Sequence, residues 1–141
     1  MGFAHTLPQT NLYTHGTLVT EMHAHLAFWG AYAMIVLAII SYALPNLTGR
    51  KLYESARGRA AFWLSNIGMV GMTIAFGVAG VAQVYLERKY HMDFMTVQKE
   101  VSIHFVVLLI CATMFTTGIV LYVIDFYKHG RPSEEALGMV E

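Results

Sequence analysis

Two histidines separated by one residue, His23 and His25, stand at the start of a long apolar stretch. Imidazole is a common ligand of haem iron and of other transition metals. The stretch runs from Leu26 to Leu44 without a charged side chain, which predicts a membrane-spanning helix. Residues i and i+2 of an α-helix are about 200° apart. The two imidazoles therefore leave the helix on opposite sides and suit two metal centres better than one.

Two haems on either side of one helix would use this geometry. An ionisable side chain inside a membrane is costly, so an intramembrane histidine is by default a functional hypothesis. The alternative is that both imidazoles simply reach toward the membrane interface. Glu21, two residues before His23, could orient a ligand or contact water above the site. It is equally an exposed acid near a helix N-terminus, where it suits the helix dipole.

The remaining histidines give weaker signals. Four of them fall in expected loops or at membrane edges, where a solvated imidazole is expected: His5, His15, His91 and His129. His104 lies early in the third apolar run and is expected to be a hydrogen-bonded packing residue. The sequence leaves the roles of His15, Glu21 and His104 open.

Composition indicates an integral membrane protein. The mean hydropathy is +0.50, and 56% of residues are hydrophobic against 13% charged. Three apolar runs, Leu26–Leu44, Ala60–Leu86 and Val101–Ile124, are each close to or above the ~20 residues that cross a bilayer. We expect an all-α fold with helices at about 17–44, 60–87 and 101–127 and a polar tail at 128–141. Because only one of the three helices carries credible ligands, we expect a single membrane segment of a larger subunit.

Loop charges predict the orientation of the helices. The first loop, 45–59, contains four basic residues and one acid, and basic residues also follow the third helix. The positive-inside rule places this loop and the C-terminus in the cytoplasm and the N-terminus outward. Pro45 and Gly49 are expected to end the first helix. The N-terminus lacks the features of a cleavable signal, and the zero net charge gives no reason to expect a nucleic-acid partner.

Small and polar residues inside the second helix predict close packing. Its glycines let helices approach closely in lipid: Gly68, Gly71, Gly77 and Gly80. Asn66 and Gln83 are expected to hydrogen-bond to neighbouring helices. The single cysteine, Cys111, excludes an internal disulfide and is expected to be a small packing residue.

The segment 12–32, LYTHGTLVTEMHAHLAFWGAY, resembles the tenth transmembrane helix of the catalytic, cytochrome b subunits of bacterial nitric oxide reductases. These belong to the haem–copper oxidase superfamily, and the three helices resemble the last three of its twelve-helix bundle. The resemblance implies that His23 is the proximal ligand of a high-spin haem b at the reaction site. It implies that His25 is one of two axial ligands of a low-spin haem b. Ala24 and the upstream THGT favour these reductases over oxygen-reducing oxidases, which typically have an aromatic residue between the histidines.

The same resemblance implies that other metal ligands lie outside this chain. A non-haem iron next to the high-spin haem, and the second ligand of the low-spin haem, would be held by earlier helices. We therefore expect the C-terminal quarter to third of a subunit, as a split gene product, a truncated gene model or a fragment, inactive alone. Its complete enzyme would reduce two NO to N2O and water in the bacterial inner membrane. The implied partners are the missing N-terminal helices, lipid, and a cytochrome c subunit or quinol as electron donor.

Three other functions fit parts of the pattern. The chain could be a three-helix haem-b membrane anchor of a quinone-linked respiratory complex, although a histidine pair with opposed faces is unusual for such anchors. It could be a fragment of an oxygen-reducing haem–copper oxidase. It could also be a haem-free packing subunit.

Overall fold

The computed structural model describes residues 2–47 and 55–129, and within them every regular element is helical. The all-α, membrane-type fold class is therefore confirmed. The elements follow in the order α1 (Gly2–Thr6), α2 (Pro8–Thr14), α3 (Leu18–Ala27), η1 (Phe28–Ala33), α4 (Met34–Leu47), α5 (Ala56–Val84), η2 (Tyr85–Lys89), α6 (Phe94–Glu100) and α7 (Ser102–His129). The elements η1 and η2 are π-helical turns, which often occur at functional sites.

Three continuous spans are long and apolar enough to cross a membrane: Leu18–Leu47, Ala56–Lys89 and Ser102–Lys128. The second begins at Ala56 instead of residue 60 because the Ser55 side chain accepts a hydrogen bond from the Gly58 amide and so caps the helix. The sequence did not predict the short helices α1, α2 and α6. Asp93 caps α6 in the same way, through the Thr96 amide.

The prediction that Pro45 ends the first helix is wrong, because α4 continues through Pro45 to Leu47. Proline removes one backbone donor, a loss that membrane-spanning helices tolerate. Gly49 lies outside the described residues. The third helix also extends to His129, into the segment expected to be a polar tail; the rest of that segment lies outside the described residues.

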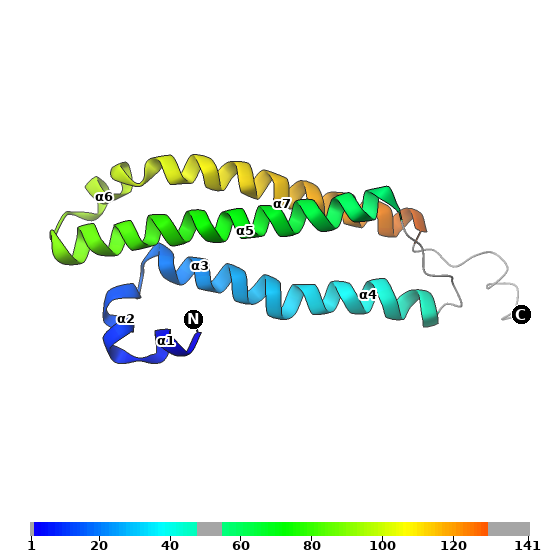
Figure 1. The fold of residues 1–141 in the computed structure, drawn as a ribbon, viewed down its shortest axis with the longest axis horizontal. Helices are drawn as coiled ribbons and strands as arrows, with labels where there is room; N and C mark the ends of the chain where they lie inside the picture. Colours follow the sequence, from blue (N-terminus) through cyan, green and yellow to red (C-terminus); the bar gives the residue numbers. More distant parts are fainter. Residues whose placement is uncertain (1, 48–54, 130–141) are drawn as a thin grey trace, which may run out of the picture.

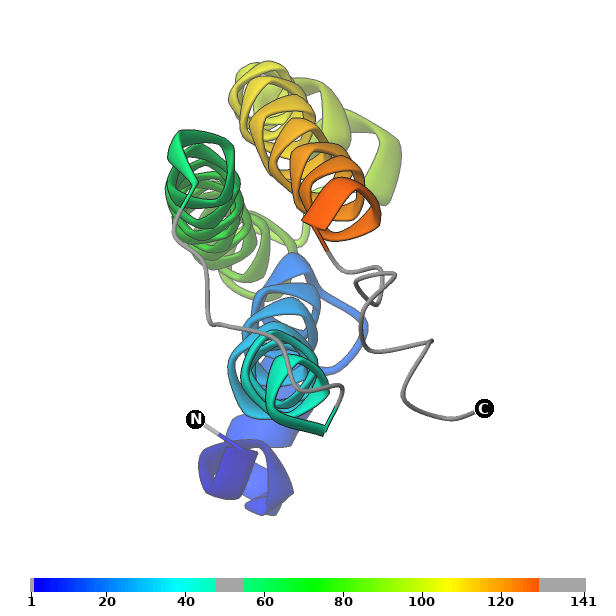
Figure 2. The same cartoon turned by 90° about the vertical axis from the view of Figure 1, so that its right-hand side faces the viewer.

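The helix α5 lies between the other two spans. It runs beside α7 along their length and packs on α3, whereas α4 diverges from both (Figure 1, Figure 2). We compared the most apolar part of each span. In the span that contains α5, 44% of this part is buried, whereas in each of the other two spans only 6% is buried. The first and third spans therefore keep broad apolar surfaces for lipid or for other helices.

Glycine contacts hold α5 and α7 together. A Cβ on Gly68 would lie 2.6 Å from the Phe115 backbone nitrogen, and one on Gly118 would lie 2.5 Å from the Ser65 nitrogen. At Gly71 a Cβ would meet the Cys111 sulfur at 2.5 Å. These distances leave no room for a side chain, which confirms the predicted close packing.

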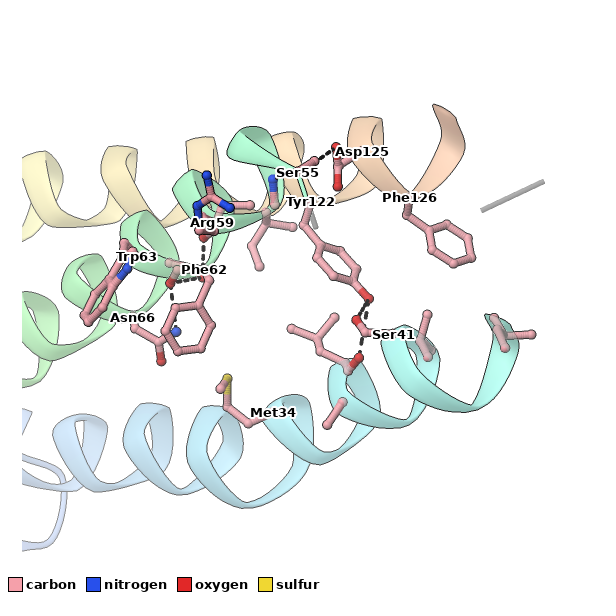
Figure 3. A pocket seen from close by; sticks show the side chains of 18 of the residues that line it. Met34, Ser41, Ser55, Arg59, Phe62, Trp63, Asn66, Tyr122, Asp125 and Phe126 are labelled. Atoms are coloured by element: carbon pink, nitrogen blue, oxygen red, sulfur yellow. Dashed lines mark hydrogen bonds between the residues drawn. The ribbon is translucent and has the colours of Figure 1, made fainter. Parts of the chain in front are cut away.

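Where α4 diverges, a cavity of about 480 Å³ separates it from α5 and α7 (Figure 3). Two of the hydrogen bonds that border this cavity join separate helical segments. The Ser41 and Tyr122 hydroxyls are 3.0 Å apart and join α4 to α7, and the Ser55 hydroxyl donates to the Asp125 carboxylate at 2.8 Å. The remaining wall is mostly apolar.

Candidate functional site

Both histidines of the H-x-H pair lie in α3, which starts directly after a turn at Gly16. Gly16 has a φ of +72°, a conformation that favours glycine. The first helical amide, that of Leu18, donates a hydrogen bond to the Gln83 side-chain oxygen at 3.0 Å. Helix α3 passes into the π-helical turn η1 at Phe28, three residues after His25. The sequence prediction that Gln83 bonds to a neighbouring helix is confirmed.

The His25 imidazole is fixed by its own helix and by α5. Its Nδ1 lies 2.9 Å from the Glu21 carbonyl oxygen, and its ring centroid is 5.0 Å from that of Phe76. A carbonyl oxygen can only accept, so Nδ1 must carry the proton. The Nε2 lone pair is then left for a metal, with the tautomer and ring orientation set by the hydrogen bond.

The His23 imidazole contacts a different element. Its ring stacks on that of His5 in α1, with centroids 5.2 Å apart and planes at 29°. A Cβ on Gly2 would lie 3.3 Å from the His23 Nε2. The two imidazoles thus face separate surroundings, His23 under α1 and His25 beside α5.

These surroundings differ in how well they fit a haem. His25 could hold a haem iron, because the Nδ1 hydrogen bond fixes a tautomer whose Nε2 can bind a metal. In the described arrangement the ring of His23 stacks on that of His5, and Gly2 lies near its Nε2, so a haem at His23 would require α1 to move. No cluster of three or more His, Cys, Asp or Glu side chains able to hold a metal occurs in the part of the chain that the structure describes.

The structure also places the residues whose roles the sequence left open. His15 is exposed in the turn before α3, and the Glu21 carboxylate is largely exposed, 4.0 Å from the His25 Nδ1. The His104 Nδ1 lies 3.2 Å from the Val101 carbonyl oxygen in a half-buried position. This confirms His104 as a hydrogen-bonded packing residue.

Aromatic packing supports the helix just beyond the histidines. Trp29 is buried in η1, donates a 3.5 Å hydrogen bond to the Asn66 side-chain oxygen, and meets Phe115 edge to face. Trp29 is therefore a packing residue, whereas Phe28 and Tyr32 are exposed.

Sequence reasoning missed two neighbours of the histidines, Phe76 and His5. Phe76 is seven residues before Gln83, and that spacing places both on one face of α5. An aromatic residue two turns from a polar intramembrane residue is a signal that could have drawn attention to Phe76. No signal in the sequence pairs His5 with His23, because that contact depends on how α1 and α2 fold back.

Comparison with known proteins identifies the family of this chain. The family model described as Cytochrome C and Quinol oxidase polypeptide I matches residues 1–114. A nitric oxide reductase subunit of Stutzerimonas stutzeri is 41% identical over 138 aligned positions, which cover 92% of this chain and 29% of that protein. The aligned region is a C-terminal portion of the relative. The chain belongs to the Cytochrome C and Quinol oxidase polypeptide I family, that is, to the membrane subunits of the haem–copper oxidase type.

Proposed function

We propose that this chain is the haem-ligating C-terminal part of a nitric oxide reductase large subunit, which with its other helices reduces two NO to N2O and water. The single observation that carries this proposal is the placement of His25, whose Nδ1 hydrogen bond leaves Nε2 available as a metal ligand. The 41% identity to a protein named as part of a nitric oxide reductase favours this reaction over oxygen reduction.

The proposal gives the two histidines separate roles. His25 holds the iron of a low-spin haem b, and His23 holds that of a high-spin haem b at the reaction site. The haems supply electron transfer and an iron that binds NO. The assignment of His23 requires that Gly2 and His5 of α1 move away from its Nε2. A non-haem iron would take its ligands from helices outside this chain.

Residues of this chain would prepare the site. The Glu21 carbonyl fixes the proton on the His25 Nδ1, and Phe76 limits rotation of that imidazole. Because His23 and His25 share one helix, the two irons would be joined by a short stretch of α3. Buried Trp29 and its partner Phe115 hold the helix beyond the pair against α7.

The proposed setting is the bacterial inner membrane, crossed several times, with the N-terminus outward and the C-terminus in the cytoplasm. The excess of basic residues in the loop 45–59 supports this orientation. The partners would be the N-terminal helices of the same large polypeptide, lipid of the bilayer, and a cytochrome c subunit or quinol as electron donor.

Spectra of the assembled subunit test the assignment. This chain would be produced with the missing N-terminal helices, as wild type and as His23→Leu, His25→Leu and His91→Asn. The last is a matched control, because His91 is exposed at a positive φ of 53° that asparagine tolerates. Reduced-minus-oxidised and CO-difference spectra would report the two haems, and N2O formation would report turnover.

We expect His23→Leu to lose CO binding and N2O formation while keeping the low-spin spectrum. His25→Leu should lose the low-spin spectrum, and His91→Asn should resemble wild type. Normal spectra and turnover in both α3 variants would refute the proposal. A single low-spin haem without CO binding in the wild type would instead support a haem-b membrane anchor.

A further inference from the structure

The helix α5 contacts the histidine-bearing helix α3 along one line, which we call the α3–α5 seam. It pairs four residues of α5 with four of α3: Gln83 with Leu18, Gly80 with Val19, Gly77 with Met22, and Phe76 with His25. The two helices run in opposite directions, so numbering falls along α5 as it rises along α3. The imidazole of His25 is the last member of this series.

Gln83 anchors the first end of the seam. It is 2% exposed, its side-chain oxygen accepts from the Leu18 amide at 3.0 Å, and its amide nitrogen donates to the Glu87 carboxylate at 2.9 Å. The Thr17 side chain gives α3 no cap, because its hydroxyl donates to the Thr14 carbonyl at 2.7 Å. Gln83 therefore satisfies a helix-terminal amide that a capping residue would normally satisfy.

Two glycines set the separation of the helices. A Cβ on Gly80 would lie 2.4 Å from the Val19 backbone nitrogen, and a Cβ on Gly77 would lie 2.8 Å from the Met22 sulfur. At Gly80 the obstacle is backbone, which cannot move aside without moving the helix. The first turns of α3 are therefore held at close range with a fixed rotation.

Because both helices are regular, the contact between Gln83 and Leu18 also determines where His25 lies. Seven residues separate Leu18 from His25, and seven separate Phe76 from Gln83. Seven residues are about two turns, or roughly 10.5 Å, and return to nearly the same helix face. Fixing Leu18 on Gln83 thus brings His25 opposite Phe76, where the rings meet at 5.0 Å with planes at 33°.

We propose that Gln83 and Phe76 are positioning residues for His25: Gln83 sets the height of the imidazole along α5, and Phe76 sets the plane of its ring. This inference rests on the proposed role of His25 as a haem ligand. Groups that orient a metal-bound histidine tune the metal as well as hold it. Changes at the seam should therefore alter the electronic signature of the low-spin haem without removing the haem.

The test uses the assembled subunit and electron paramagnetic resonance of the oxidised low-spin haem, together with its reduction potential. Gln83→Met keeps the length of the side chain but loses both hydrogen bonds, and Phe76→Leu keeps an apolar side chain but loses the ring. Phe76→Tyr restores a ring. Matched controls are Gln98→Met on α6 and Phe105→Leu on α7, which leave the seam intact.

We expect Gln83→Met and Phe76→Leu to keep both haems and CO binding but to shift and broaden the highest low-spin g value and to shift the potential. Phe76→Tyr and both controls should match wild type. Unchanged signals in the two seam variants would overturn the inference, as would equal shifts in the controls. If Gln83→Met fails to assemble, the inference is tested by Phe76→Leu, which should shift the low-spin signal, and by Phe76→Tyr, which should not. A wild-type low-spin signal that survives His25→Leu would refute the proposed function itself.

Discussion

The Ser55 hydroxyl donates a 2.8 Å hydrogen bond to the carboxylate of Asp125, and so joins the start of α5 to the end of α7. The same Ser55 oxygen accepts from the Gly58 amide at 2.8 Å. Asp125 is 4% exposed, and its charge lies at the positive end of the α5 dipole. One small side chain therefore caps one membrane helix and provides a donor to a buried charge on another.

Removing the Ser55 hydroxyl should lower the stability of the assembled subunit by more than the loss of a helix cap alone. Ser55→Ala loses a cap worth ~1 kcal/mol and deprives a buried carboxylate of one donor, which adds about 1–3 kcal/mol. We expect a clearly lower unfolding midpoint for the assembled subunit titrated with denaturing detergent. Ser102→Ala removes an exposed serine hydroxyl at the start of α7 and should leave the midpoint nearly unchanged. Equal midpoints for the two variants would contradict this explanation.

The packing of α5 on α7 should be sensitive to one methyl group. A Cβ at Gly118 would lie 2.5 Å from the Ser65 nitrogen and 2.9 Å from the Ala61 carbonyl oxygen, both backbone atoms. Gly118→Ala should therefore force the helices apart and cost about 1–3 kcal/mol. The same detergent titration measures this loss. Gly30→Ala is the matched control, since nothing lies within 4 Å of its added Cβ; a loss there as large as at Gly118 would show that close approach is not the cause.

Helix α1, through His5, should protect the His23 imidazole from chemical modification. The His5 ring stacks on that of His23 and is itself 3.1 Å from the Thr14 hydroxyl. In this chain without haem, His5→Ala should speed acylation of the His23 imidazole by diethyl pyrocarbonate, followed by mass spectrometry. His25, which contacts Phe76 instead, should react at its wild-type rate. If the His23 rate is unchanged, α1 does not shield it.

The cap of α6 should depend on pH. The pKa of Asp93 lies below its usual value of 3.8, first because the Thr96 hydroxyl and then because the Thr96 amide donates to the carboxylate. A group with a lowered pKa in the folded state stabilises fully above its unfolded pKa and loses that effect as pH falls through the folded one. We therefore expect the cap to be intact above pH 3.8 and to weaken only below it.

Nuclear magnetic resonance of the Thr96 amide checks this expectation. The chemical shift of the Thr96 amide should change with pH, with a midpoint below pH 3.8 in the wild type. Asp93→Asn keeps a capping side chain without the charge, so its Thr96 shift should not follow that titration. A wild-type midpoint at or above 3.8 would mean that the charged form of Asp93 gains nothing from the cap.

The sequence by itself determined the fold class, and its small residues predicted where helices pack closely. Three long apolar runs predict three membrane-spanning helices, because an uncharged run of that length is stable in a bilayer only with its backbone bonded internally. Periodicity and residue size also predicted the close contacts of Gly68 and Gly80. The spacing of His23 and His25 predicted opposed imidazoles as a property of helix geometry alone.

Only the tertiary structure decided what each residue meets. The pairing of Gln83 with Leu18, of Ser55 with Asp125 and of His5 with His23 depends on how separate helices pack or fold back. Local rules also gave the wrong end for the first helix, which continues through Pro45 to Leu47. Contacts between distant segments follow from the packing of whole helices, and no local pattern of residues encodes them.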